Sequence, residues 1–198
     1  MLIDPHKNSP SSDLFNKILK QGVGYIDEAI SNKTAENYYL DFKITEEQDY
    51  SRKRSLLASD KKNYARCISA FGNGEGGIIV WGIKTGPSAA DYASKKKPIA
   101  EVSNFASLLE GFTSTLTSPP HPKVVSKIIF QDEEQDLGYV ITHVEKSNQR
   151  PFQVLNDNEF KYYIRAGSSS KGAPDTFIRG LLGSGPQPDV WIQYLVSP

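Results

Sequence analysis

The sequence predicts an α/β protein of the α+β type: a single domain with a mixed, mainly antiparallel sheet flanked by helices. The apolar run "IIVWGI" (78–83) is typical of a strand buried on both faces. Residues 123–130 and 137–144 read as two strands joined by the acidic turn "QDEEQD", which indicates a hairpin. Helical spacing occurs between these strand patterns, and we find no internal repeat.

The N-terminal part combines helical turns with one alternating segment. Residues 1–12 are rich in Pro, Ser and Asn and predict an irregular leader. The domain then begins at residue 13 with a helical pattern that extends to Ile30. "NYYLDFKI" (37–44) alternates as a strand does, so that Asp41 and Lys43 project from one face.

The centre and the C-terminal part supply the remaining elements. A helix is expected from Ser59 to the glycines at 72–77, followed by the buried strand. Residues 86–98 read as a surface loop, and Ser103 begins an amphipathic helix. A strand at 160–165 and a short helix at 175–183 complete a domain spanning 13–183, and residues 184–198 form an extension set apart by Pro186 and Pro188.

Composition excludes several classes of protein. The chain has 198 residues, of which 38% are hydrophobic, and its 23 Lys and Arg balance its 23 Asp and Glu. Any nucleic-acid site must therefore be a local basic patch. The single cysteine, Cys67, excludes an internal disulfide framework and a multi-cysteine zinc site. The start lacks the apolar core of a signal peptide and no run reaches transmembrane length, so we expect a cytoplasmic protein without a membrane partner.

The glycine-rich loop "FGNGEGG" (71–77) has the spacing of the G-x-G-x-x-G motif but not its structural context. A dinucleotide fingerprint needs strand, loop and helix in that order, so that the phosphates meet a helix N-terminus. Here the loop follows a helix and precedes a strand. We therefore predict a tight helix-to-strand turn whose Glu75 can point towards a site.

Acidic residues around 36–43 suggest a metal site. Asp41 and Lys43 form the D-x-K arrangement that suits metal-dependent phosphodiester cleavage, in which the acid holds the metal and the lysine steadies the attacking water. Glu36 could supply a second metal ligand, while Glu75 is a further catalytic candidate. Acid-x-Lys also arises by chance, and an ion pair on a solvated strand face is the plain structural alternative.

Basic residues favour binding of nucleic acid. Lys161, Tyr163 and Arg165 would share one face of the 160–165 strand, mixing cations with an aromatic ring as single-strand sites do. "GSSSKG" (167–172) offers hydroxyl and N–H groups to phosphate. The complete candidate set is Lys43, Arg52, Lys53, Arg54, Lys61, Lys62, Arg66, Lys84, Lys161, Tyr163 and Arg165.

"ENYYLDFK", "AFGNGEGGIIVWGIK" and "KYYIRAGSSS", in this order, resemble the Schlafen AlbA-type DNA-binding domain family over roughly residues 25–183. The resemblance implies a mixed α/β fold and a nucleic-acid-binding module, in some members part of bacterial regulatory or defence proteins. Nuclease-active members use three carboxylates; Glu36 and Asp41 match the first two, whereas Lys84 stands where the family often has an acid. A cation there would repel a metal ion.

Three functions follow as hypotheses. The first is a nucleic-acid-binding module, for DNA or RNA, that acts in regulation or in bacterial or phage defence and for which the sequence identifies no cofactor. The second is a ribonuclease that uses Mg²⁺ or Mn²⁺ held by Glu36 and Asp41, with Lys43 and Glu75 in the catalytic set. The third is a homo-oligomerising interaction or sensor domain in which "VWIQYLV" packs on a partner.

Overall fold

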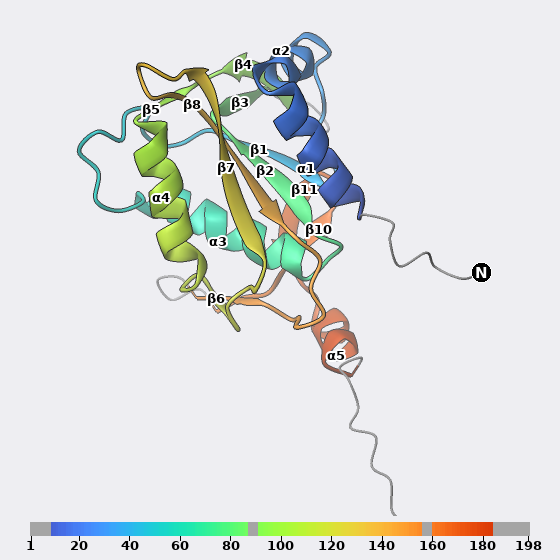
Figure 1. The fold of residues 1–198 in the computed structure, drawn as a ribbon. Coiled ribbons are helices and arrows are strands. Elements are labelled where there is room, and N and C mark those ends of the chain that lie inside the picture. The colour runs from blue at the N-terminus through green and yellow to red at the C-terminus, as the bar shows by residue number, and fades with distance from the viewer. Residues whose placement is uncertain (1–8, 87–90, 156–159, 184–198) are drawn as a thin grey trace, which may run out of the picture.

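A five-stranded sheet lies between two layers of helices in the computed structural model, which describes residues 9–86, 91–155 and 160–183 (Figure 1). The helices are α1 (Pro10–Gln21), α2 (Val23–Ser31), α3 (Ala58–Gly72), α4 (Val102–Thr113) and α5 (Asp175–Gly183). The strands of the sheet are β1 (Leu40–Lys43), β2 (Gly77–Trp81), β5 (Ile99–Ala100), β7 (Val124–Asp132) and β8 (Leu137–Val144). The smaller two-stranded sheets are formed by β3 (Ile83–Gly86) with β4 (Tyr92–Lys96), β6 (Thr117–Ser118) with β9 (Gln153–Val154), and β10 (Tyr163–Ala166) with β11 (Ser169–Gly172).

The main sheet is mixed and mainly antiparallel, as predicted. Strands β1 and β2 run parallel, with Asp41 opposite Ile79. Strand β8 pairs antiparallel with β2, β5 and β7 and is the centre of the sheet. A parallel pair needs a crossover connection, and here that connection contains α3.

Each face of the sheet has its own apolar core. Residues of α1 and α2 such as Ile18 and Ile26 pack with Leu40 and Phe42 on one face. On the other face α3 and α4 pack around Trp81. Alternation along β1 therefore buries Leu40 and Phe42 against α1 and α2 and turns Asp41 towards α3.

Several predicted elements are confirmed and others are wrong. The hairpin of β7 and β8 and the helix at 175–183 are present. The loop expected at 86–98 instead contains β4, and the strand expected at 78–83 is divided at Gly82, whose φ of +96° breaks the regular extended backbone. Residues 10–12, expected to be irregular, belong instead to α1, which begins at Pro10 with Ser9 as its N-cap. The extension 184–198, and with it the "VWIQYLV" segment, lies outside the described residues.

Asn73, at the C-terminus of α3, ties that helix to the strands beside it. Its side chain is fully buried. The amide Nδ2 donates hydrogen bonds to the carbonyls of Phe152 (3.1 Å) and Tyr163 (3.0 Å), and Oδ1 accepts one from the Phe152 N–H (2.6 Å). The asparagine of the glycine-rich loop is thus a structural clamp, since it satisfies buried backbone groups far away in the sequence.

We expect Asn73→Ala to lower the free energy of unfolding by about 3 kcal/mol, because it leaves buried backbone groups of Phe152 and Tyr163 unpaired. Urea denaturation followed by circular dichroism measures the change. The matched control is Asn148→Ala at an exposed asparagine, which should stay within about 0.5 kcal/mol of the unchanged protein. Equal losses in the two variants would contradict the clamp.

Candidate functional site

A cleft of about 240 Å³ opens where the side chains of β1 face α3 and the hairpin of β10 and β11. Strand β1 supplies Asp41 and Lys43, because alternate residues of a strand share a face. The end of the turn between β10 and β11, with the first residues of β11, adds three consecutive serines. The lining residues are Glu36, Asp41, Lys43, Asn63, Arg66, Cys67, Asp91, Ser168, Ser169 and Ser170.

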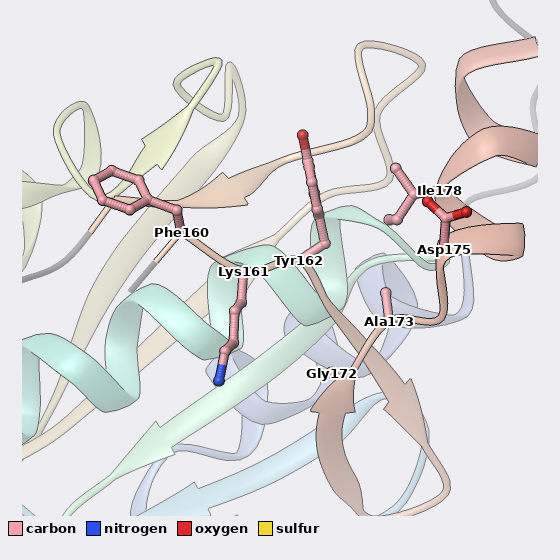
Figure 2. Close-up of a pocket in the computed structure, with 7 residues that line it drawn as sticks. All are labelled: Phe160, Lys161, Tyr162, Gly172, Ala173, Asp175 and Ile178. Carbon is pink, nitrogen blue, oxygen red and sulfur yellow. The ribbon is translucent and has the colours of Figure 1, made fainter. Parts of the chain in front are cut away.

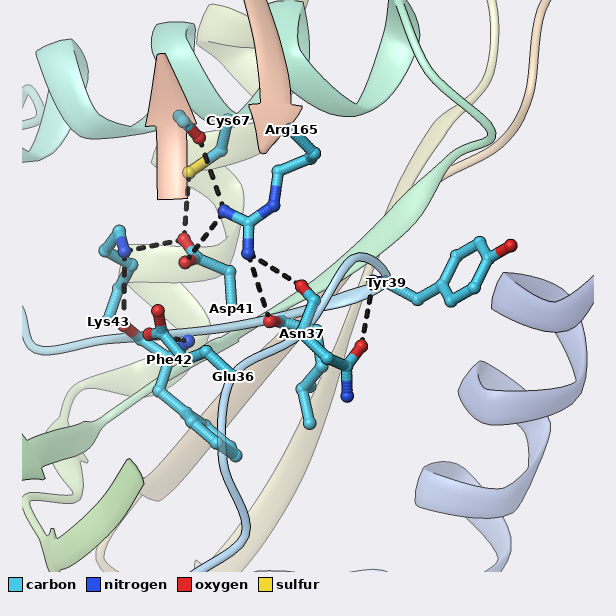
Figure 3. A network of polar contacts seen from close by, with 10 residues as sticks. Glu36, Asn37, Tyr39, Asp41, Phe42, Lys43, Cys67 and Arg165 are labelled. Carbon is cyan, nitrogen blue, oxygen red and sulfur yellow. Dashed lines mark hydrogen bonds and ion pairs between the residues drawn. The ribbon is translucent and has the colours of Figure 1, made fainter. Parts of the chain in front are cut away.

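Asp41 is the centre of a buried polar network at the floor of this cleft (Figure 3). Its side chain is only 2% exposed. The Lys43 ammonium lies 2.6 Å from Oδ2 and the Arg165 guanidinium 3.2 Å from Oδ1. The Cys67 thiol also donates to Oδ2, at 3.1 Å. Both oxygens of this carboxylate are therefore engaged by groups of the protein itself.

Arg165 reaches Asp41 from β10 and is held in place by the backbone. Its Nη2 donates to the carbonyls of Asn37 (2.8 Å) and Leu40 (3.3 Å), and its guanidinium lies over the ring of Phe71. The side chain is 1% exposed. A buried guanidinium needs such a set of acceptors, so Arg165 is a structural partner of Asp41.

The two acidic groups of the network have opposite electrostatic environments. Burial would raise the pKa of Asp41, but Lys43 and Arg165 outweigh it and hold that pKa below its ordinary value. Burial, followed by the neighbouring Asp41 charge, raises the pKa of Glu36 to about 8. One oxygen of Glu36 accepts a hydrogen bond from the Phe42 N–H at 2.9 Å. Glu36 is consequently mostly neutral at pH 7, while Asp41 stays charged.

Cys67 of α3 is buried, and its thiol donates a hydrogen bond to Asp41. Burial raises the pKa of this thiol well above its usual range, so it remains a protonated donor. The sequence carries no signal for this contact, since the apolar stripe of α3 accounts for the cysteine equally well.

The cleft residues do not fit the divalent metal that the nuclease hypothesis requires. Metal ligands need free oxygen lone pairs, and those of Asp41 face Lys43, Arg165 and Cys67. In the part of the chain that the structure describes, no group of three or more His, Cys, Asp or Glu side chains lies together in a way that could hold a metal ion. The positive charges of Lys43 and Arg165 beside Asp41 further disfavour a metal cation.

Glu75 does not join the other catalytic candidates. It precedes β2, whereas Asp41 pairs with Ile79 in the middle of that strand. Its carboxylate lies 2.6 Å from the Lys146 ammonium and 3.8 Å from the Arg150 guanidinium. The turn after α3 therefore directs Glu75 to a different surface, which corrects the prediction that it points towards the site.

The predicted aromatic and cationic face of the 160–165 strand is also wrong. Tyr163 and Arg165 point inward and are buried, because they pack on α3 and on Asp41. Lys161 is exposed and lines another pocket, of about 300 Å³, between the residues just before β10 and the start of α5 (Figure 2). The three residues thus form no common platform.

Of the remaining basic candidates, only Lys43 and Arg66 line the cleft. Arg66 lies over the ring of Tyr163, 5.2 Å from its centroid. Lys62 is exposed four residues before Arg66, on the same side of α3. Lys61 extends over the ring of Phe112, and Lys53 lies 3.7 Å from Glu47. The exposed candidates outside the cleft include Arg52, Arg54 and Lys84.

Besides Cys67, two lining residues were missed by sequence reasoning. Asn63 lies on α3 one turn before Arg66, so helical spacing from Arg66 could have found it. Asp91 immediately precedes β4, and its carbonyl accepts a hydrogen bond from the Glu36 N–H at 2.7 Å. That pairing depends on a strand that the sequence did not predict.

Comparison with known protein families identifies the domain. A family model described as Schlafen, AlbA_2 matches residues 36–174, which include the cleft and all five strands of the main sheet but not α1 and α2. The chain belongs to the Schlafen AlbA_2 family. The match includes every residue that lines the cleft, so the cleft is part of the Schlafen AlbA_2 domain itself.

Solved structures with a similar chain path are distant from this Schlafen AlbA_2 domain. The crystal structure of the DIP2311 protein from Corynebacterium diphtheriae is 13% identical with a TM-score of 0.43, covering 79% of this chain and 27% of that one. The N-terminal domain of a RecG-related protein from Nitrosomonas europaea, solved by NMR, is 14% identical with a TM-score of 0.44, covering 83% and 93%. A comparison with curated proteins gave no match. These similarities carry no conclusion about function.

We expect Asp41→Ala to lower the free energy of unfolding by about 3–5 kcal/mol, because it leaves the buried guanidinium of Arg165 without its counter-ion. Urea denaturation of the purified domain measures the loss. Asp91→Ala is the matched control, since it removes an exposed carboxylate from the same cleft and should change stability by no more than about 0.5 kcal/mol. A small loss for Asp41→Ala would show that the ion pair contributes little.

Proposed function

We propose that this Schlafen AlbA_2 domain binds nucleic acid by placing a backbone phosphate in the cleft beside Asp41. The observation that carries the proposal is the set of donors gathered there. Lys43 and Arg66 supply cationic groups, and Ser168–Ser170, at the turn before β11 and the start of that strand, supply hydroxyls. Cations together with hydroxyl groups are the usual contacts to phosphate oxygens.

The charges of the cleft favour an anion near neutral pH. Asp41 is compensated inside the protein by Arg165 and Lys43. Glu36 is mostly protonated, because its pKa is raised to about 8. With Glu36 neutral, the cations Lys43, Arg66 and Arg165 outnumber the carboxylates Asp41 and Asp91 around the cleft. A phosphodiester therefore meets a local positive field although the whole chain is neutral.

The proposed role is binding without cleavage. A phosphodiesterase that uses a metal would need Asp41 as a ligand, and its oxygens are already engaged by Lys43, Arg165 and Cys67. Contacts to the phosphate backbone position a strand but do not read its sequence. The proposal therefore concerns nucleic-acid strands in general, with exposed basic residues beside the cleft, such as Lys62, adding to the electrostatic attraction.

We expect the affinity for labelled oligonucleotides to fall steeply as the NaCl concentration rises, and Arg66→Ala to weaken binding about tenfold at low salt. The variant should also reduce the slope of log K against log salt by about 0.7–0.9, the value of one phosphate contact. Fluorescence anisotropy measures both quantities. Lys127→Ala serves as the control, because Lys127 is exposed on β7 and does not line the cleft. Affinity that does not respond to salt would overturn the proposal.

We expect phosphate-backbone binding to weaken between about pH 7 and pH 9, because Glu36 loses its proton around pH 8 and adds a negative charge to the cleft. The Glu36→Gln variant should bind oligonucleotides at both pH values as tightly as the unchanged protein does with Glu36 protonated. The Gln amide oxygen can still accept the hydrogen bond from the Phe42 N–H. Anisotropy titrations of both proteins across this range test the expectation. An identical pH profile for the two proteins would show that Glu36 does not face the bound phosphate.

A further inference from the structure

The ribbon of β3 and β4 presents two lysines directly opposite each other. Lys84 pairs with Lys95 in the antiparallel register. A bulge follows, in which Thr85 pairs with Ala93 and Ser94 is passed over, and the Ser94 hydroxyl donates to the Lys84 carbonyl at 2.9 Å. Because of this bulge, Lys95 and not Ser94 lies on the same face of the ribbon as Lys84.

This lysine pair, Lys84 with Lys95, faces away from the core. Ile83 and Ala93 are buried on the opposite face of the ribbon, among the residues of α1 and α2. The next residue of β4, Lys96, is turned to that side, where it forms an ion pair with Asp27 of α2. Lys84 and Lys95 are both exposed, and no carboxylate among the described residues lies within ion-pair distance of either ammonium group.

Two like charges at directly opposed positions of a strand pair destabilise it. The cost is removed when an anion lies between the two ammonium groups, or when one of the charges is replaced. The described part of the protein supplies no such anion, so the lysine pair is set up for an external one.

The ribbon is connected to the cleft at both of its ends. The Gly82 N–H, just before β3, donates to the Lys43 carbonyl at 2.8 Å. At the other end Asp91, just before β4, lines the cleft. Lys84 lies two residues from the end of β3, about 7 Å along an extended strand. The face that carries Lys84 and Lys95 corresponds to the face of β1 that carries Lys43, because Leu40, Phe42, Ile83 and Ala93 all belong to the core on the other side.

We propose that the lysine pair forms a second phosphate-binding position, on which the nucleic-acid strand continues after its phosphate in the cleft. This inference rests on the function proposed above and adds the path of the strand, which leads from the cleft between α3 and β1 over the ribbon of β3 and β4. The ligand is a polyanionic phosphodiester backbone. Lysine contacts of this kind are made to phosphates and add to affinity without selecting a sequence.

The experiment compares Lys84→Ala/Lys95→Ala with Lys96→Ala. The control removes one lysine charge from β4, at a side chain that faces α2 instead of the proposed path. Binding of fluorescein-labelled single-stranded and duplex oligonucleotides is measured by anisotropy over a series of NaCl concentrations. The double variant should reduce the slope of log K against log salt by about 1.4 for single strands and about 1.8 for duplexes, the values of two contacts. Lys96→Ala should leave the slope unchanged.

A second variant separates binding from stability. Lys84→Glu places a carboxylate opposite Lys95, so its melting temperature should rise above that of the unchanged protein while its affinity for the oligonucleotides falls.

The possible failures can be told apart. If the double variant keeps the full salt slope while Arg66→Ala still reduces it, the ribbon path is overturned and the cleft proposal stands. If Lys96→Ala reduces the salt slope as much as the double variant does, the loss comes from the net charge of the protein and not from the position of the lysines. The ribbon path is then overturned as well. If the unchanged protein binds neither oligonucleotide, both proposals fall.

Discussion

The buried ion pair between Asp41 and Arg165 is the constraint on which the rest of the site depends. It joins β1 to β10, which are separated by more than half of the chain, and both side chains are almost fully buried. Removing two charges from water is costly, and the cost is offset only when the remaining hydrogen-bonding positions are also satisfied. The carbonyls of Asn37 and Leu40 accept hydrogen bonds from Arg165, whose buried Nε has no partner among the described residues, while Lys43 and Cys67 contact Asp41. At the floor of the cleft, both oxygens of Asp41 are therefore engaged by groups of the protein itself.

This network determines whether the cleft favours a cation or an anion. Because Asp41 is compensated internally, its charge does not repel an incoming anion as an exposed carboxylate would. The same charge, together with burial, keeps Glu36 protonated near neutral pH. Two acids that suggest a metal site in the sequence thus produce a cleft suited to an anion, because their surroundings differ from those of solvent-exposed metal ligands. Residue identity alone could not distinguish the two outcomes.

Local patterns predicted most of the fold and part of the site. Alternation in β1 placed Asp41 and Lys43 on one face, and the acidic turn predicted the pairing of β7 with β8, since these signals are contained in neighbouring residues. The face of Arg165 was wrongly predicted, because its burial depends on a carboxylate 124 positions away. Strand β4 was missed for a similar reason: its polar sequence is held by the backbone pairing with β3 and not by an apolar pattern.

The glycine-rich loop acts on the site indirectly, through backbone geometry. A side chain at Gly77 would come within 2.1 Å of the Phe71 ring, so only glycine allows β2 to begin so close to the end of α3. That close turn leaves Asn73 inside the protein, where it binds the Tyr163 carbonyl, while Ser69 of α3 accepts a hydrogen bond from the Tyr163 N–H. With Tyr163 held on both sides of its backbone, alternation along β10 directs Arg165, two residues later, to the same inward face and onto Asp41. The loop therefore contributes no phosphate cradle of its own; it positions the strand whose arginine neutralises the floor of the cleft.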